Sequence, residues 1–467
     1  MGGNITVRAR IWDIWRRAET GPICPVRTFE TKEYWPRLKE LIKEYDIKYD
    51  PECLVPTDDT LIDDVYKAGM NLLLDVGVIC TDTDRIIKFE ENEIEEMLRN
   101  KPEEVTLGEG KDAITVRPRK LEDKALPKIQ ARILGGISAE EMVVKLFQSF
   151  AMEPLVDILN PQPVPPTLEG LPLKVGSPFE MHAEICNVGF ARTALRRAGR
   201  PGMPLFGTSS ATDTPVIAAC SPEYGWRRCD ALPTIMLPQM KINYVQLRKA
   251  MCYHQYGCLS IGYGAGYIGG LSGGPEGSVI TSVAESIASY LLYQNDLIDV
   301  SIDSVKYRSI DRPIRMLIWG ANLANAAFYT NTNLAGGTDP SFTNAGPCTE
   351  MALLEWAAEG IGRVVTGQAI LGGGTGRLSA YADYFAPLEA RFLGEVCRAA
   401  AGMKLEDANE MVKEVLAKYE EKVKNPPIGK KFQECYDLAT LTPSKEYLEL
   451  YRKTKKELED MGLKFEY

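Results

Sequence analysis

Residues 258–305 contain the segments CLSIGY (258–263), SVITSVAESIASYLLYQ (278–294) and VSIDSV (300–305). The first and the last are short runs rich in apolar and β-branched residues, which is typical of buried strands. The long middle segment places its apolar residues at the spacing of a helix. A strand, a helix and another strand in this order predict two parallel strands that are joined by a helical crossover.

The same alternation of strands and helices continues on both sides of this segment. Further strands are predicted at 154–160, 203–206 and 368–374. Alternation over about 270 residues predicts a parallel sheet, and a single closed (β/α)8 TIM barrel fits this length. An open doubly wound sheet is the alternative. The helices predicted in this region are 177–199, 244–257, 278–294, 312–329, 347–367 and 387–402.

The segments outside this region predict additions to the barrel. We expect one α/β domain over residues 1–467, with an N-terminal extension (1–125) and a C-terminal helical segment (403–467). Within the extension, the spacing of apolar residues predicts helices at 30–50, 58–77 and 86–100 and a hairpin at 103–119.

The composition excludes several classes of protein. Of the 467 residues, 45% are hydrophobic and 25% are charged, as in ordinary globular domains. The net charge of −10 argues against nucleic acid or an anionic membrane as a partner. No apolar run approaches the roughly 18–20 residues of a membrane span, and we expect no signal peptide. Eleven cysteines without a framework spacing indicate reduced thiols in a cytoplasmic protein.

The stretch GAGYIG (264–269) matches the G-x-G-x-x-G fingerprint of dinucleotide-binding proteins. Such a site requires a helix that begins among the glycines, so that the N-terminus of the helix meets the pyrophosphate. Here GLSGGPEG (270–277) follows, and the next helix is predicted to begin near Ser278. The favoured interpretation is therefore a long flexible loop at the C-terminal end of a strand.

The chain has only two histidines, His182 and His254, which limits its chemistry. His182 lies near the start of the predicted helix 177–199, close to the catalytic rim of a barrel, and is a candidate acid, base or hydrogen-bond donor. His254 lies between Cys252 and Cys258 in a C-x-H-x3-C pattern, which lacks a fourth ligand for zinc. We predict no metal site.

Six stretches, in order along the chain, carry more information than the pattern of elements. Together they resemble the monomethylamine:corrinoid methyltransferase family of methanogens over nearly the whole chain. The resemblance implies a (β/α)8 barrel, a homo-oligomer, no tightly bound cofactor, and transfer of a methyl group to the Co(I) of a separate corrinoid protein. The stretches are ICTDTDRIIKF (79–89), LGEGKDAITVR (107–117), AGRPGM (198–203), AGPCTEM (345–351), EARFLGEVCRAAAG (389–402) and GKKFQECYDLATLTPSKEY (429–447).

The departures from the family fall where its chemistry is expected. The resemblance places the family's pyrrolysine at Phe206 and its two active-site glutamates near Pro233 and Tyr263. A family glutamine falls near Pro340, and Glu350 matches, either as a first-turn acid or as a site residue. The imine of pyrrolysine and the carboxylates of the two glutamates are the groups that the resemblance implies for binding an amine. A site without them suits an aromatic methyl donor better than a small amine. The predicted methyl donor is therefore a methoxylated aromatic compound.

The predicted reaction is an attack by Co(I) on the methyl carbon of the ether, with a phenolate as leaving group. Tyr263, His182 or His254 is predicted to donate the proton. A methylamine or quaternary amine held in an aromatic cage is the alternative donor, and a non-catalytic barrel that only binds the corrinoid protein is a third possibility. The predicted substrate-binding residues are Phe206, Trp226, Arg227, Tyr267 and Glu350.

Overall fold

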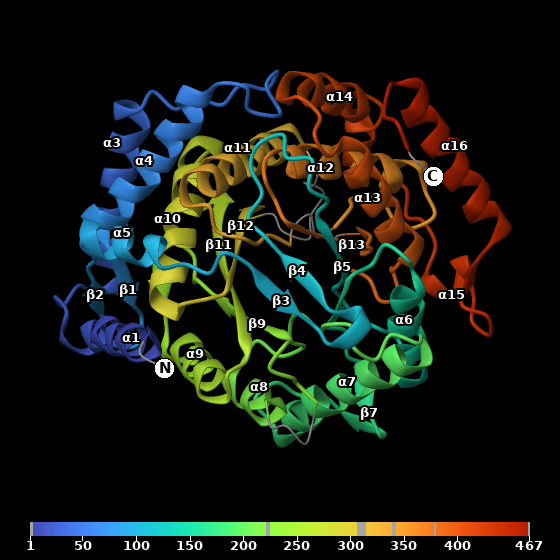
Figure 1. Ribbon diagram of the computed structural model, residues 1–467, viewed down its shortest axis with the longest axis horizontal. Helices are drawn as coiled ribbons and strands as arrows, with labels where there is room; N and C mark the ends of the chain where they lie inside the picture. The colour runs from blue at the N-terminus through green and yellow to red at the C-terminus, as the bar shows by residue number, and fades with distance from the viewer. Residues whose placement is uncertain (1–2, 221–224, 306–313, 339–341, 378–379, 466–467) are drawn as a thin grey trace.

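The computed structural model describes residues 3–220, 225–305, 314–338, 342–377 and 380–465. At its centre, parallel strand segments form a closed ring (Figure 1). Short bridges join the segments that fall outside the longer strands, and β13 pairs in parallel with β5 to close the ring. In order around the ring, the segments are β5 (Lys128–Ile133), β6 (Ile158–Pro161), residues 205–206, β9 (Ala231–Ile235), β11 (Leu259–Ile268), β12 (Leu297–Ser304), Gly336 and β13 (Ile370–Gly373).

Each of these segments is followed by a helix on the outside of the ring (Figure 1). A closed ring of eight parallel segments, each followed by a helix, is the (β/α)8 barrel that the alternation predicted, and it excludes the open doubly wound sheet. The outer helices are α6 (Glu140–Met152), α7 (Pro178–Arg197), α8 (Asp213–Ala219), α9 (Tyr244–Tyr256), α10 (Pro275–Tyr293), α11 (Arg315–Thr332), α12 (Glu350–Val365) and α13 (Pro387–Ala400).

A hairpin of β3 (Val105–Leu107) and β4 (Ile114–Val116) closes the amino end of the barrel. In Figure 1 it crosses the front of the ring. Its side chains Val105, Leu107 and Val116 are buried in one cluster with residues at the starts of the barrel strands, such as Ile158 and Leu297. The hairpin therefore covers the amino end of the barrel with apolar side chains.

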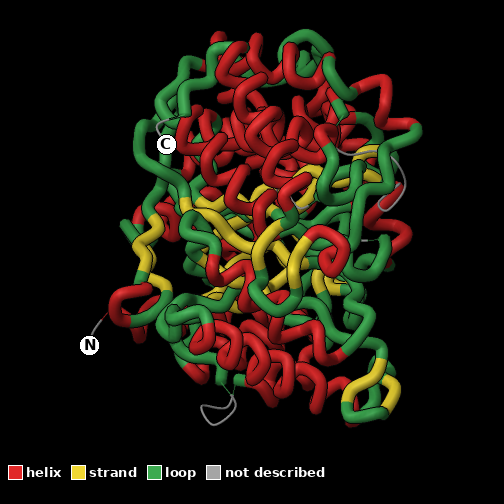
Figure 2. The backbone as a smooth tube through the Cα atoms, turned by 90° about the vertical axis from the view of Figure 1, so that its right-hand side faces the viewer, coloured by secondary structure: helices red, strands yellow, loops and turns green. Residues whose placement is uncertain are grey.

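The rest of the chain packs on the outside of the barrel. The N-terminal helix α4 packs on α10 and α11, whereas the C-terminal helices α14 and α16 pack on α12. Figure 2, turned by 90°, shows the strands as a central band with helices above and below it. No helix in the described ranges is long and apolar enough to cross a membrane. The bounds are α1 (Gly3–Thr20), α3 (Trp35–Glu44), α4 (Asp59–Val76), β1 (Val78–Cys80), β2 (Arg85–Ile87), α5 (Glu91–Arg99), α14 (Leu405–Ala417) and α16 (Lys445–Asp460).

Two expectations from the sequence are wrong at the level of elements. Residues 86–100 do not form one helix, because Ile86 and Ile87 belong to β2 and pair with β1, and α5 begins only at Glu91. The stretch 264–269 was expected to be a loop. Instead, residues 264–268 belong to β11, which continues to Ile268 and pairs with β12. The turn that follows is short, and α10 begins at Pro275.

Alternate glycines of β11 explain the G-x-G-x-x-G match. A Cβ atom on Gly264 would lie 2.5 Å from the backbone nitrogen of Ser286, and one on Gly266 would lie 1.9 Å from the backbone oxygen of Ser278. Both neighbours belong to α10, so the glycines allow the helix to lie directly on the strand. Their role is close packing of helix and strand.

Candidate active site

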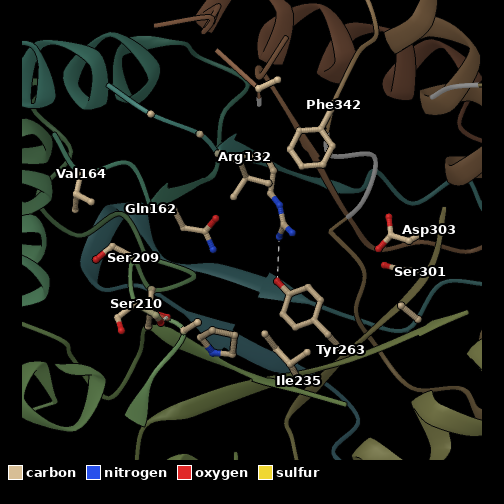
Figure 3. A pocket seen from close by; sticks show the side chains of 18 of the residues that line it. Arg132, Gln162, Val164, Ser209, Ser210, Ile235, Tyr263, Ser301, Asp303 and Phe342 are labelled. Atoms are coloured by element: carbon tan, nitrogen blue, oxygen red, sulfur yellow. Dashed lines mark hydrogen bonds between the residues drawn. The ribbon is translucent and has the colours of Figure 1, made fainter. Parts of the chain in front are cut away.

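A cavity of about 700 Å³ lies at the carboxyl ends of the barrel strands (Figure 3). Strands β5, β9, β11 and β12 contribute side chains to its walls, and residues 208–211 and 380–382 contribute loops. The position and size of this cavity are those of active sites in TIM barrels, which form at this end of the barrel. The hairpin of β3 and β4 covers the other end of the barrel.

Arg132, at the end of β5, organises the floor of the cavity. Its Nη1 donates to the hydroxyl oxygen of Tyr263 at 3.0 Å and to Oγ1 of Thr338 at 3.1 Å. Thr338 in turn donates to Oδ2 of Asp299 at 2.8 Å, and Ser301 donates to the same oxygen at 3.1 Å. This chain of hydrogen bonds crosses the barrel from β5 to β12 and fixes the orientation of the Tyr263 ring.

Tyr263 remains a neutral phenol in this environment. Complete burial raises the pKa of Tyr263, and the nearby Arg132 opposes the shift only in part. A guanidinium can only donate hydrogen bonds, so the phenol oxygen is the acceptor in this pair. The hydroxyl proton of Tyr263 is therefore directed away from Arg132.

One side of the cavity combines aromatic rings with a carboxylate. Tyr263 and Tyr267 of β11, Phe342 and the half-exposed Tyr381 all line it, together with Asp303 at the end of β12. Figure 3 shows Phe342 above the Arg132 side chain, and Asp303 beside Ser301. Aromatic faces and a carboxylate around one space are the surroundings that bind an ammonium group.

The other side of the cavity holds Ser209 and Ser210, across from Asp303 in Figure 3. The backbone N–H groups of both serines donate to Oε2 of Glu184, at 3.0 and 2.9 Å. Lys249 of α9 also lines the cavity, and its side chain is fully buried. Burial lowers the pKa of Lys249 to about 8, and the attraction of Glu184 opposes this shift.

Of the aromatic residues predicted on the barrel strands, Tyr267 and the predicted donor Tyr263 line the cavity and Phe206 does not. The expectation that Phe206 forms a cavity wall is wrong. Phe206 is fully buried in the cluster at the amino end of the barrel, because residues 205–206 bridge β6 and the first residue of β9. That strand segment reaches the cavity only at Thr208.

Both histidines lie away from the cavity, so neither is placed to donate a proton there. His182 is half exposed on α7, with Nε2 3.4 Å from a carboxylate oxygen of Glu169. His254 lies near the end of α9, where Nε2 is 2.9 Å from the backbone oxygen of Tyr293. An outer helix runs back toward the amino end of the barrel, so residues late in α9 leave the active-site face.

The other predicted binding residues have structural surroundings. Trp226 is buried in the core outside the barrel ring. Arg227 donates to the backbone oxygen of Met203 at 2.9 Å and pairs with Asp230. Glu350, at the start of α12, forms an ion pair of 2.7 Å with Lys453. None of the three lines the cavity.

Several cavity residues were missed by the sequence analysis. Arg132 and Asp303 alternate with apolar residues along β5 and β12, a pattern that would have placed them on the inner face of the barrel. Lys249 gave no signal, because one lysine in a polar helix resembles an exposed charge. The position near Pro233 that the resemblance indicated does line the cavity, whereas Pro340 lies outside the described residues.

Comparisons with known proteins identify relatives along nearly the whole chain. The family profile of monomethylamine methyltransferase MtmB matches residues 9–463. The monomethylamine methyltransferase MtmB3 of Methanosarcina barkeri (strain Fusaro) is 32% identical over 97% of this chain and 98% of its own. MtmB1 of Methanosarcina acetivorans is 31% identical with the same coverage.

Two solved structures extend the similarity to the fold. The crystal structure of the Methanosarcina barkeri monomethylamine methyltransferase MtmB and that of the hydroxylamine MtmB complex each have a TM-score of 0.92. Each is 31% identical in sequence, and the match covers 97% of this chain and 98% of that chain. The chain therefore belongs to the monomethylamine methyltransferase MtmB family and is a methyltransferase built on a (β/α)8 barrel.

Proposed function

We propose that this protein transfers a methyl group from an N-methylated ammonium compound to the Co(I) of a separate corrinoid protein. The observation that carries this proposal is the presence of Asp303 and several aromatic rings around one cavity at the active-site face of the barrel. Membership in a family whose relatives are named for monomethylamine supports the same class of donor.

The reaction is a displacement at the methyl carbon. Co(I) of the partner supplies an electron pair, a cobalt–carbon bond forms, and the carbon–nitrogen bond breaks with its electron pair left on nitrogen. The nitrogen must carry a positive charge before it can leave as a neutral amine. The cavity must therefore bind an ammonium group and hold its methyl carbon in line with the cobalt.

In this proposal, the side chains around Asp303 bind the ammonium group and orient its methyl carbon. The rings of Tyr267 and Phe342 attract a cation, with a contribution of about 0.5–2 kcal/mol each. The guanidinium of Arg132 already lies over the Tyr263 ring, 5.6 Å from its centroid. Asp303 adds the opposite charge. The hydrogen bond from Arg132 holds the Tyr263 ring in one orientation, which limits the positions that the ammonium group can adopt.

The structure removes the argument for a methoxylated aromatic donor. That hypothesis depended on Phe206 as a wall of the pocket, and Phe206 is part of the buried core. The acid and the aromatic rings favour the amine alternative instead. The hypothesis of a non-catalytic barrel loses support because the relatives along the whole chain are named methyltransferases.

The corrinoid protein would approach the open cavity face and bring its cobamide with it. We also propose that the enzyme works in the cytoplasm as a homo-oligomer, without nucleic acid or a membrane as a partner. In this proposal the chain itself needs no tightly bound cofactor, because the partner supplies the cobalt.

Turnover with defined donors tests the proposed function. The purified protein is mixed with reduced cob(I)alamin or a reduced corrinoid protein and with methylamine, tetramethylammonium, N-methylated amino acids or methoxybenzoates. We expect methylcobamide, followed by its absorbance, only with N-methyl compounds. Formation of methylcobamide with methoxybenzoates alone, or with no donor in the panel, contradicts the proposal.

A pair of variants on β12 links turnover to the cavity. Asp303→Asn removes the carboxylate charge, and we expect KM for an ammonium donor to rise about tenfold, as for the loss of one charged interaction. Ile302→Val changes the neighbouring residue, which points to the opposite face of the strand and does not line the cavity. Its KM should equal that of the wild type. Equal KM values for Asp303→Asn and the wild type would show that Asp303 does not bind the ammonium group.

A further inference from the structure

Lys249 lines the same cavity and has unusual surroundings for a lysine. Its side chain is fully buried, and its Nζ has no hydrogen-bond partner among the residues that the structure describes. Lysine is rarely buried without a partner, because removal of the ammonium group from water is unfavourable. A buried cation at the wall of a ligand cavity is therefore a candidate for binding a group that the protein itself does not provide.

The nearest acid does not fill this role. Glu184 lies close enough to attract Lys249, but the two form no hydrogen bond. Oε2 of Glu184 already accepts hydrogen bonds from Ser209 and from the backbone N–H of Ser210. Glu184 thus fixes the loop that forms this side of the cavity, and the amine of Lys249 has no acceptor within the described ranges.

The position of Glu184 also locates Lys249 in the cavity. Since Glu184 binds Ser209 and Ser210, Lys249 lies on their side of the cavity. Asp303 lies on the other side in Figure 3. Lys249 and Asp303 therefore lie on opposite sides of the cavity, and its volume of about 700 Å³ far exceeds that of a two-heavy-atom amine such as methylamine.

We propose that the methyl donor is zwitterionic: its N-methylated ammonium group lies on the Asp303 side and its carboxylate binds the ammonium group of Lys249. N-methylated amino acids are the corresponding class of compound. Lys249 is in this proposal the residue that determines specificity. The inference rests on the proposed function, because it assigns the second end of the molecule whose N-methyl group is transferred.

Matched donors test the role of the carboxylate. N-methylglycine and N-methylglycinamide have the same size, but only the first carries a carboxylate. N-methyl-β-alanine and 4-(methylamino)butanoate, each with its amide, extend the distance between the charges. For at least one chain length, we expect kcat/KM of the wild-type enzyme to be at least about tenfold higher for the acid than for its amide. Equal values at all three lengths overturn the proposal.

Variants of Lys249 test the residue. With Lys249→Met, KM for the preferred acid should rise about 10- to 100-fold while kcat changes little and KM for the amide stays the same. Lys249→Arg should restore part of the loss. Arg248 precedes Lys249 in α9 and forms an ion pair with Asp213. Arg248→Met also removes one positive charge, and it should leave both KM values unchanged. An equal change of KM for acid and amide in Lys249→Met overturns the proposal.

Binding measurements separate this inference from the proposed function. Isothermal titration of the acid and the amide into the wild type and Lys249→Met requires no turnover. Selective loss of affinity for the acid in the variant supports the carboxylate site even if no N-methyl compound is a methyl donor. Equal affinities in both proteins overturn it even if methylamine is turned over.

Discussion

Lys249 places an ammonium group where burial disfavours its charge. The pKa of its amine falls from 10.5 to about 8, first because of burial, while Glu184 of α7, Asp213 of α8 and Cys220 oppose the shift. Because the pKa in the folded chain lies below that in the unfolded chain, the folded state holds this proton less tightly. Lys249 therefore lowers stability at neutral pH, and an anionic ligand would relieve this effect.

Replacement of Lys249 by methionine should stabilise the fold. A pKa lowered from 10.5 to about 8 corresponds to roughly 3 kcal/mol at pH 7, where both states carry the proton. Loss of the attraction to Glu184 offsets part of this gain, so we expect the free energy of unfolding to rise by about 1–3 kcal/mol. Unfolding in denaturant at pH 7 measures the difference.

The difference should depend on pH in a defined direction. Between about pH 8 and 10.5 the unfolded wild type binds a proton that the folded wild type lacks, so the stability of the wild type rises relative to that of Lys249→Met. The gap between the two proteins should therefore narrow at about pH 9.5. A variant that is less stable than the wild type at pH 7, or a gap that does not narrow, would show that the amine has a structural partner.

Individual site residues could be predicted where the sequence shows at which end of a barrel strand they lie. Tyr263 and Tyr267 lie at the end of, or just after, the strand predicted at 258–263, so the sequence placed them near the active-site end, and both belong to β11. Phe206 ends an apolar run and was expected at the same end, but its strand segment pairs at the amino end of the barrel. Lys249 could not be predicted, because its burial results from the packing of α9 on α8, β9 and β11.

At the scale of elements, the glycines of β11 determine how closely α10 approaches the barrel. We expect Gly266→Ala to destabilise the fold by about 1–3 kcal/mol or more, because its Cβ would lie 1.9 Å from the backbone oxygen of Ser278 and no flexible side chain could move aside. Since β11 also carries Tyr263 and Tyr267, turnover should fall as well. Thermal unfolding and kcat/KM measure the two effects.

Gly189 provides the matched control for this substitution. It lies within α7, and a Cβ atom there would meet nothing within 4 Å. Alanine favours a helix over glycine by up to about 1 kcal/mol, so Gly189→Ala should be neutral or stabilising. If Gly266→Ala unfolds at the same temperature as Gly189→Ala, the close contact between β11 and α10 does not limit stability.

The type of fold could be predicted from the long elements, whereas several barrel strands could not. In strand β5, Lys128, Gln130 and Arg132 interrupt the run of apolar residues, and β9 has Pro233 at its centre. The seventh position of the ring is a single bridge at Gly336. None of these three has the apolar run that identifies a buried strand, because their pairing depends on neighbours on both sides.

At the scale of the whole molecule, the two ends of the barrel have different roles. The hairpin of β3 and β4 fills the amino end with Val105, Leu107 and Val116, and the opposite end holds the cavity. This separation lets one end supply stability and the other chemistry. Changes at the hairpin should therefore affect folding and leave the binding of donors largely unchanged.

Leu107 tests this separation. It is fully buried among the starts of the barrel strands, and Leu107→Ala should lower the free energy of unfolding by about 2–5 kcal/mol. Below its unfolding temperature, the variant should keep the wild-type KM for the methyl donor, because the cavity lies at the other end of the barrel. Thr106→Ala, on the exposed side of the same strand, should change neither quantity by much. A raised KM in Leu107→Ala without loss of stability would show that the hairpin shapes the active site.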